Sequence, residues 1–426
     1  MSDVPYALGE LGWLQFQQLC DAVLELEAGV EPRAWSGEAD RTRRVDVEHD
    51  LALPSLDLKL RGPVQVAAVW EPADPRIVIA GPQERVLRRE ELARVVEARA
   101  DLRLRMPSLL GIRPLEGLVA GDVAAGSSVD AAGAHALARV YVPTAAYARA
   151  LAVLARHRFA VLTGPPEMGK TAAATMVALA RMSAGWEAHE CRGPDDLLRA
   201  LVPDRAQVFI ADDAFGSTEY RPDAAERWAR DLPRILRVLD DRHWLLWTSR
   251  PAPLRAGLHR VHQERGAERF PNPGEVQVDA SALTVAEKAL IFLRHVRAAG
   301  APRGTRALAR RVGPAIVAHP HFTPERIRRF AERRLAELPH AGPGTYALLQ
   351  LAERELAEPT DAMAASLRAL SPEYRALLVA MLDQPDGPVP ERDLVEVLHR
   401  HQTTELVRRP ADLIDRVTDH FLRVLP

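Results

Sequence analysis

The sequence predicts an α/β protein in which a domain with a parallel sheet follows a small α/β domain and precedes a helical region. Three features support this fold class. A glycine-rich loop at 164–171 stands between an apolar run and an alanine-rich segment. Strand-like and helix-like segments alternate from about 135 to 280, which is typical of βαβ units. From 284 onward the hydrophobic pattern is helical.

Length and composition set the broad class. The chain has 426 residues, enough for two to four domains, with 47% hydrophobic and 27% charged residues, as in ordinary soluble proteins. A net charge of −2 does not indicate a nucleic-acid partner, although local arginine patches leave one open. Cys20 and Cys191 lack metal-ligand spacing and favour a reducing compartment. With no signal peptide and no apolar run near 18 residues, we expect a cytoplasmic protein without membrane contact.

Residues 1–104 are predicted to form the small α/β domain. Apolar residues between Trp13 and Leu24 recur at helical spacing, and a second helix is expected over 87–99. Residues 105–134 are assigned to a linker, because 119–134 are small, glycine-rich and without periodicity. The strand-like segments of this domain are 44–48, 56–60, 64–70 and 76–80.

The loop at 164–171 fits G-x-x-x-x-G-K-[ST], the phosphate-binding motif. An apolar run at 159–163 reads as a buried parallel strand, and 171–181 reads as a helix. In this context the loop N–H groups and the helix N-terminus face phosphate, Lys170 bridges the β- and γ-phosphates, and the Thr171 hydroxyl binds Mg²⁺. Only three of the 56 basic residues are lysines, so composition alone does not account for a lysine at the position where the motif requires one.

Two further strands of the 135–280 domain end in polar residues. Asp212 and Asp213 follow the apolar run 207–211, where Asp212 is expected to hold Mg²⁺ and Asp213 to orient or deprotonate the attacking water. Arg250 ends a Thr-Ser-Arg triplet after the run 243–247. Parallel strands bring their carboxyl ends to one edge, where Arg250 can sense the γ-phosphate; an ordinary strand exit is the alternative.

The helical region divides at a Gly-Pro break. Residues 281–341 are predicted to form a helical lid, opened by a capping box from Thr284 to Glu287 and by a second helix at Thr323-Pro324. Residues 342–426 are predicted to be winged-helix-like, with a strand beginning at 421–426.

Several motifs occur in one order between about 140 and 340. Together they resemble the STAND class of P-loop NTPases, and within it the novel-STAND branch of bacterial conflict and antiviral systems. The resemblance implies a switch in which ADP holds a closed monomer, while ATP and a trigger drive homo-oligomerisation or engage a partner protein as sensor or effector. The motifs are VPTAAY at 142–147, GPPEMGKTAAA at 164–174, FIADDAFG at 209–216, LLWTSR at 245–250, LTVAEKALIFLRH at 283–295 and HPHFTPERIRRF at 319–330.

The resemblance also implies a site for ATP or ADP with Mg²⁺. It implies that Asp213 and Arg250 are catalytic. It also implies that Thr171 and Asp212 bind the metal ion. The lid residue Arg326 is expected to contact the nucleotide. Glu167 departs from the family, where many relatives have glycine, and a carboxylate there weakens affinity unless it points away from the phosphates. The implied nucleotide contacts are Val142 and Pro143 beside the base, and Gly164, Pro165, Pro166, Met168, Gly169, Lys170, Thr171 and Ala172 at the phosphates.

The N-terminal domain resembles Mrr-like restriction endonucleases through the segments at 16–29, 36–47 and 62–70. In that family an acid and an (E/Q)-x-K pair bind Mg²⁺ and activate water. Asp40 and Gln65 match, but Ala67 stands where lysine is required. We therefore expect a nuclease-like fold without activity. This alignment takes 64–70 as the metal-site strand, because the segment is apolar enough to be buried on both faces. The alternative register, Asp57 with Lys59, would restore a site.

Three hypotheses of function remain open from the sequence. The first is an ATP-binding and slowly hydrolysing switch in defence or signalling. The second is an ATP-regulated, Mg²⁺-dependent DNA endonuclease, and the third a winged-helix DNA-binding regulator. The arginines between 326 and 334 are expected to form a solvated helix face more than a nucleic-acid site.

Overall fold

A computed structural model of the chain forms two compact units, which are described separately. The first comprises 1–143 and 175–188, and the second comprises 144–174 and 189–426. The structure describes residues 5–30, 42–217, 220–265, 273–335, 344–382, 389–390, 392–393 and 395–396.

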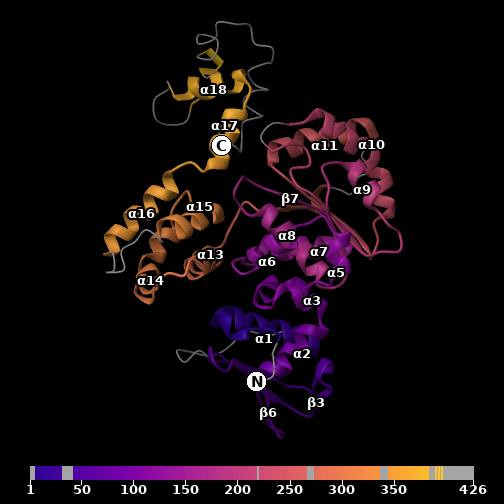
Figure 1. Ribbon diagram of the computed structural model, residues 1–426, viewed down its shortest axis with the longest axis vertical. Coiled ribbons are helices and arrows are strands. Elements are labelled where there is room, and N and C mark those ends of the chain that lie inside the picture. Colours follow the sequence, from indigo (N-terminus) through magenta and orange to yellow (C-terminus); the bar gives the residue numbers. More distant parts are fainter. Residues whose placement is uncertain are drawn as a thin grey trace. The chain divides into compact units, whose positions relative to one another are not determined.

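The first unit begins with a small α/β domain. Its main sheet has the order β1-β4-β5-β6, all antiparallel, and β2 and β3 form a separate hairpin. The elements, in indigo to purple in Figure 1, are η1 (Leu8–Glu10), α1 (Trp13–Ala28), β1 (Thr42–Val47), β2 (Leu51–Leu53), η2 (Pro54–Leu56), β3 (Leu58–Leu60), β4 (Val64–Val69), β5 (Arg76–Ala80), β6 (Arg85–Leu87), α2 (Arg89–Ala98) and α3 (Ala100–Arg105).

One face of this sheet is buried and the other is not. Along β4, Val64, Val66 and Ala68 are buried, whereas Gln65 is exposed. The side chains alternate because successive residues of a strand point to opposite faces. The expectation that the strand is buried on both faces was therefore wrong, and the argument built on that burial loses its basis.

Short helices lie between 107 and 138. The sequence predicted a linker over 105–134. Asp130 caps the last of them by accepting a hydrogen bond from Ala132 N–H at 3.0 Å, and Leu109 and Val123 are buried. A side chain at Gly111 would meet the backbone of Arg139 at 2.6 Å, so these turns pack closely. Small residues here allow backbone segments to approach each other closely. The elements are η3 (Pro107–Ile112), α4 (Leu115–Leu118), α5 (Gly121–Gly126) and α6 (Ala131–Ala138).

A second sheet has five strands in the order β11-β7-β10-β9-β8, in which the pairings of β10 with β7 and β9, and of β7 with β11, are parallel. Because β10 lies between β7 and β9, the loops after all three strands emerge at one edge. Figure 1 shows α9 to α11 grouped beside this sheet. The elements up to the last strand are α7 (Ala145–His157), β7 (Phe159–Thr163), α8 (Lys170–Met182), β8 (Glu187–Glu190), α9 (Pro194–Ala200), β9 (Gln207–Ala211), α10 (Pro222–Val238), β10 (His243–Ser249), α11 (Pro251–Arg265), α12 (Pro273–Val276) and β11 (Gln277–Asp279).

Trp247, in the central strand β10, is the centre of the core on the α10 and α11 side. Its ring lies 4.7 Å from that of Trp228, 4.9 Å from Phe159 and 5.2 Å from Phe215, centroid to centroid. Edge-on aromatic contacts of this kind stabilise a core beyond the area they bury. These ring contacts fix the position of β10 within the sheet.

A helical group, orange to yellow in Figure 1, follows the sheet in the sequence. The capping box of Thr284 and Glu287 and the cap of Thr323 are both present, as predicted. The predicted strand at 421–426 lies outside the described residues, and the division into lid and winged helix stays a prediction. The elements are α13 (Val285–Ala298), α14 (Arg303–Val317), α15 (Pro324–Arg329), the π-helical η5 (Phe330–Arg334), α16 (Thr345–Ala357), α17 (Asp361–Ala369) and α18 (Pro372–Leu382).

Replacing Trp247 with alanine should lower the free energy of unfolding of the second unit by about 3–5 kcal/mol, because it leaves a cavity lined by three rings. Trp247→Phe should cost clearly less, since the indole Nε1 has no hydrogen-bond partner among the described residues. Denaturant unfolding followed by tryptophan fluorescence measures both. Equal losses for the two variants would contradict this account of the core.

Candidate functional site

The loop at 164–171 turns sharply between β7 and α8. Gly164, Glu167 and Gly169 have φ values of 146°, 67° and 86°, all in the region that favours glycine. A side chain at Gly164 would also press on the backbone of Ala280 and Ser281 at 3.1–3.2 Å. The two motif glycines are therefore required by backbone geometry, and Glu167 holds an unusual conformation for its type.

Lys170 folds back over its own loop. Its Nζ donates to the carbonyl oxygens of Gly164 at 2.8 Å and Pro165 at 2.7 Å, and the side chain is buried. Burial lowers the pKa of Lys170 to about 8, with Arg250 adding to the effect and Asp213 opposing it. The ammonium group is thus poorly solvated and well placed to gain from an anion in the loop.

The Asp212 carboxylate joins the loop to the neighbouring strands. Its Oδ1 accepts hydrogen bonds from the Thr171 hydroxyl at 2.9 Å and from the Thr248 hydroxyl. Thr248 in turn accepts from the backbone N–H of Asp213 at 2.9 Å. Register explains the contact, since Trp247 pairs with Ala211 and the next residues face each other at the sheet edge. A hydroxyl and a carboxylate side by side are ligands suited to Mg²⁺.

Asp213 and Arg250 complete the polar edge. Asp213 has φ 47°, a left-handed conformation that turns the chain straight after Asp212. Burial, with Asp212 beside it, raises the pKa of Asp213 to about 6, while Arg250 and Lys170 oppose the rise. Burial lowers the pKa of Arg250, against the fields of Asp213, Glu167 and Asp212. The charges of these residues thus act on one another, as in a site built for a charged ligand.

The structure therefore brings together Lys170, Thr171, Asp212, Asp213 and Arg250. The remaining loop positions, Pro165, Pro166, Met168 and Ala172, are half-buried around them. Val142 and Pro143 belong to the first unit, so their predicted place beside the base stays a prediction.

Sequence reasoning missed the role of Thr248. It named the Thr-Ser-Arg triplet but chose only the arginine, because a threonine within an apolar strand gives no signal of its own. The position was recoverable from strand order. Once β10 lies beside β9 with Trp247 paired to Ala211, the next residue of β10, Thr248, must adjoin Asp212.

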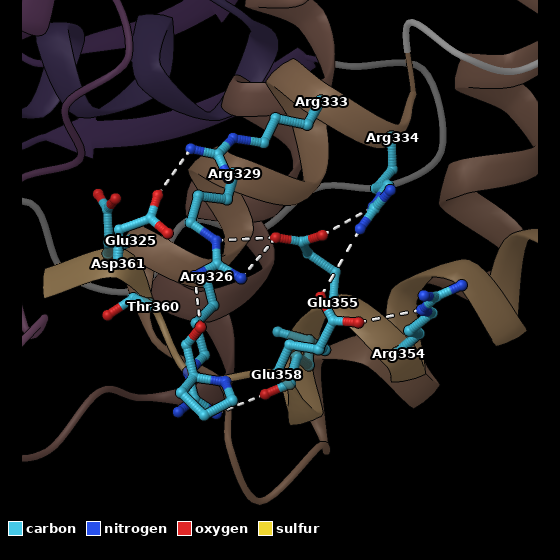
Figure 2. A network of polar contacts seen from close by, with 12 residues as sticks. Glu325, Arg326, Arg329, Arg333, Arg334, Arg354, Glu355, Glu358, Thr360 and Asp361 are labelled. Carbon is cyan, nitrogen blue, oxygen red and sulfur yellow. Dashed lines mark hydrogen bonds and ion pairs between the residues drawn. The ribbon is translucent and has the colours of Figure 1, made fainter. Parts of the chain in front are cut away.

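Arg326 and Arg329 are buried, so the expectation of a solvated arginine face was wrong for them. Arg329 pairs with the buried Glu355 at 2.6 Å, and Arg326 lies 3.5 Å from the Glu167 carboxylate in the phosphate-binding loop. Figure 2 shows Arg329 and Arg334 pointing toward Glu355, while Arg333 points toward Asp361. Glu355 follows the arginines by more than twenty residues, with a glycine and proline break between them, so no local pattern predicted this pairing.

Residues 141–298 match the family model described as Novel STAND NTPase 3. This segment is a STAND-type P-loop NTPase domain. The match covers the whole constellation from the phosphate-binding loop to Arg250 and ends before Arg326. It does not extend to the N-terminal domain or the later helices. No curated protein matches the sequence.

Two solved structures are similar to the chain at low identity. The Walker-type ATPase PABY2304 of Pyrococcus abyssi has 12% identity and a TM-score of 0.40, over 64% of this chain and 88% of that one. C. elegans PCH-2 has 14% identity and a TM-score of 0.32, over 49% of this chain, which thus spans about two thirds (65%) of that protein. At these scores the assignment depends on the STAND domain's residues and the family match.

The N-terminal nuclease hypothesis stays a prediction. Asp40 lies outside the described residues, and Gln65 donates to Asp46 at 2.9 Å on the exposed face. Lys59 is exposed on the β2–β3 hairpin. Over the described ranges, no three acidic, histidine or cysteine side chains cluster as a metal site, and no helix there is long and apolar enough to cross a membrane.

Thr248→Val should slow Mg²⁺-dependent nucleotide hydrolysis by roughly 10- to 100-fold, because Asp212 and the Asp213 N–H both lose a partner. Thr248→Ser, which keeps the hydroxyl, should restore most of the rate. Steady-state phosphate release measures both variants. A valine variant with the parent rate would show that Thr248 does not position the acidic pair.

Proposed function

We propose that the chain is a nucleotide-controlled switch that binds ATP and ADP with Mg²⁺ and hydrolyses ATP slowly. One observation carries the proposal: the Thr171 hydroxyl and the Asp212 carboxylate meet at 2.9 Å beside the buried Lys170, at the edge where three parallel strands end. The family match over 141–298 supports the same assignment.

Each residue has a defined task in this proposal. Lys170 exchanges its two loop carbonyl partners for β- and γ-phosphate oxygens, which bear more negative charge. Thr171 and Asp212 would hold Mg²⁺, which neutralises phosphate charge. Asp213 accepts a proton from, or orients, the attacking water, and its raised pKa suits a base. Arg250 stabilises charge on the γ-phosphate.

The switch proposal extends to assembly. Nucleotide exchange would change how the helices after 298 rest on the STAND domain. It would so control homo-oligomerisation, or contact with a sensor or effector protein. A place in antiviral defence or signalling follows from the resemblance to novel-STAND proteins and belongs to the proposal. Sedimentation of the full chain with ADP, and with a non-hydrolysable ATP analogue, tests the assembly step.

Lys170→Ala should reduce ATP and ADP affinity by at least about 100-fold, because a buried cation at the phosphates is removed. Titration of the full chain with a fluorescent nucleotide measures the affinity. Arg156→Ala, which removes an exposed cation from α7, is the matched control and should bind normally. Unchanged affinity in Lys170→Ala would refute the proposed function.

Asp213→Asn should leave Mg-ATP affinity within about threefold of the parent and slow single-turnover hydrolysis by roughly 100-fold. The amide keeps the shape of the side chain but cannot accept a proton. If affinity collapses while the chemical step is unaffected, the roles of Asp212 and Asp213 are reversed.

A further inference from the structure

Glu167 carries a buried carboxylate at the turn of the phosphate-binding loop. Its side chain is only 7% exposed, although the residue sits in a loop with φ 67°. A buried carboxylate is costly unless it is paired and hydrogen-bonded. Its partners therefore indicate what the residue does.

Within the described part of the chain, the hydrogen-bond and ion-pair partners of Glu167 come from the helices after the STAND domain. The Thr323 hydroxyl donates to Oε2 at 3.1 Å, the Thr360 hydroxyl donates to Oε1, and Arg326 Nε lies 3.5 Å from Oε2. Thr323 also caps α15, and Thr360 caps α17, each by accepting a backbone N–H. One loop carboxylate thus holds the starts of two helices.

Arg326 is fixed from its other side. Its Nη1 donates to the carbonyl of Leu356 at the end of α16, and Nη2 contacts the Met363 sulfur at 3.5 Å. The Nε faces the Glu167 carboxylate at ion-pair distance but donates no hydrogen bond within the described part of the chain. The guanidinium is therefore held against the loop with one N–H still able to bond an anion.

The helices that Glu167 contacts form one block. Arg329 and Arg334 both pair with Glu355, at 2.6 and 2.8 Å, and Arg329 also donates to the Pro359 carbonyl at 3.1 Å. Figure 2 shows this network joining η5 and α15 to α16. Because the block is held together internally, loss of the Glu167 contacts would free its α15 and α17 ends from the loop together.

We propose that Glu167 is an anionic latch that holds the α15–α17 block on the phosphate-binding loop and is displaced when the triphosphate of ATP enters. The proposal rests on the proposed function. Bound phosphates bring like charge next to Glu167 and compete for Arg326, so they weaken the latch, and by linkage the latch weakens phosphate binding.

The first test is a distance measurement on the full chain. Spin labels at Ala155→Cys on α7 and Ala347→Cys on α16 occupy exposed positions of the second unit, while Cys20 and Cys191 are buried. Mg-ATP should lengthen the distance in the parent chain. Glu167→Gln should show the long distance without nucleotide, and so should Glu167→Asp, whose carboxylate is too short to reach both hydroxyls.

The second test is nucleotide affinity. Glu167→Gln should bind ATP roughly tenfold more tightly, since it loses both the latch and the repulsive charge. Glu167→Asp keeps the charge and should gain less. Glu325→Gln, which removes the neighbouring carboxylate that pairs with Arg328, is the control and should match the parent in distance and affinity.

A parent-like distance in both Glu167 variants without nucleotide would overturn the latch. Weaker ATP binding in Glu167→Gln would do the same, because it would show a purely structural role. Should the labelled chain bind no nucleotide, the proposed function fails. The nucleotide-free distances would still decide whether Glu167 holds the block.

Discussion

The Asp212 carboxylate is the interaction on which the site depends. It accepts the hydroxyls of Thr171, from the phosphate-binding loop, and of Thr248, from the strand between β7 and β9. The contact exists only because β10 is inserted between those strands in a parallel sheet. An aromatic core behind Trp247 fixes that strand, so the position of the carboxylate follows from packing well away from any ligand.

Partners within the chain balance the charged groups at the same edge of the sheet. Lys170 is satisfied by loop carbonyls, Asp212 by two hydroxyls, and Glu167 by two hydroxyls and a guanidinium. Phosphate oxygens and a divalent cation would bind these charged groups more strongly than the carbonyl and hydroxyl partners do, and phosphate would compete with Glu167 for the guanidinium. The site is therefore preformed yet able to exchange its internal partners, as a switch requires.

The sequence predicted local structure well wherever one signal was sufficient. The bounds of β7, β9 and β5 and the caps at Thr284 and Thr323 follow from apolar runs and capping chemistry that involve near neighbours only. It missed the short helices within 119–138, where no periodicity was found, and the alternation of buried and exposed residues along β4. In both cases packing partners far along the chain decided the outcome.

The sequence by itself determined the phosphate-binding loop, since its glycines are required by backbone angles and its lysine by charge. It also determined that Asp212 and Asp213 end a strand. Only the tertiary structure decided that Thr248 joins Asp212 and that Glu167 faces Thr360, because 193 residues separate the latter pair. Hydrogen bonds between such distant residues depend on strand order and helix packing, which no local pattern encodes.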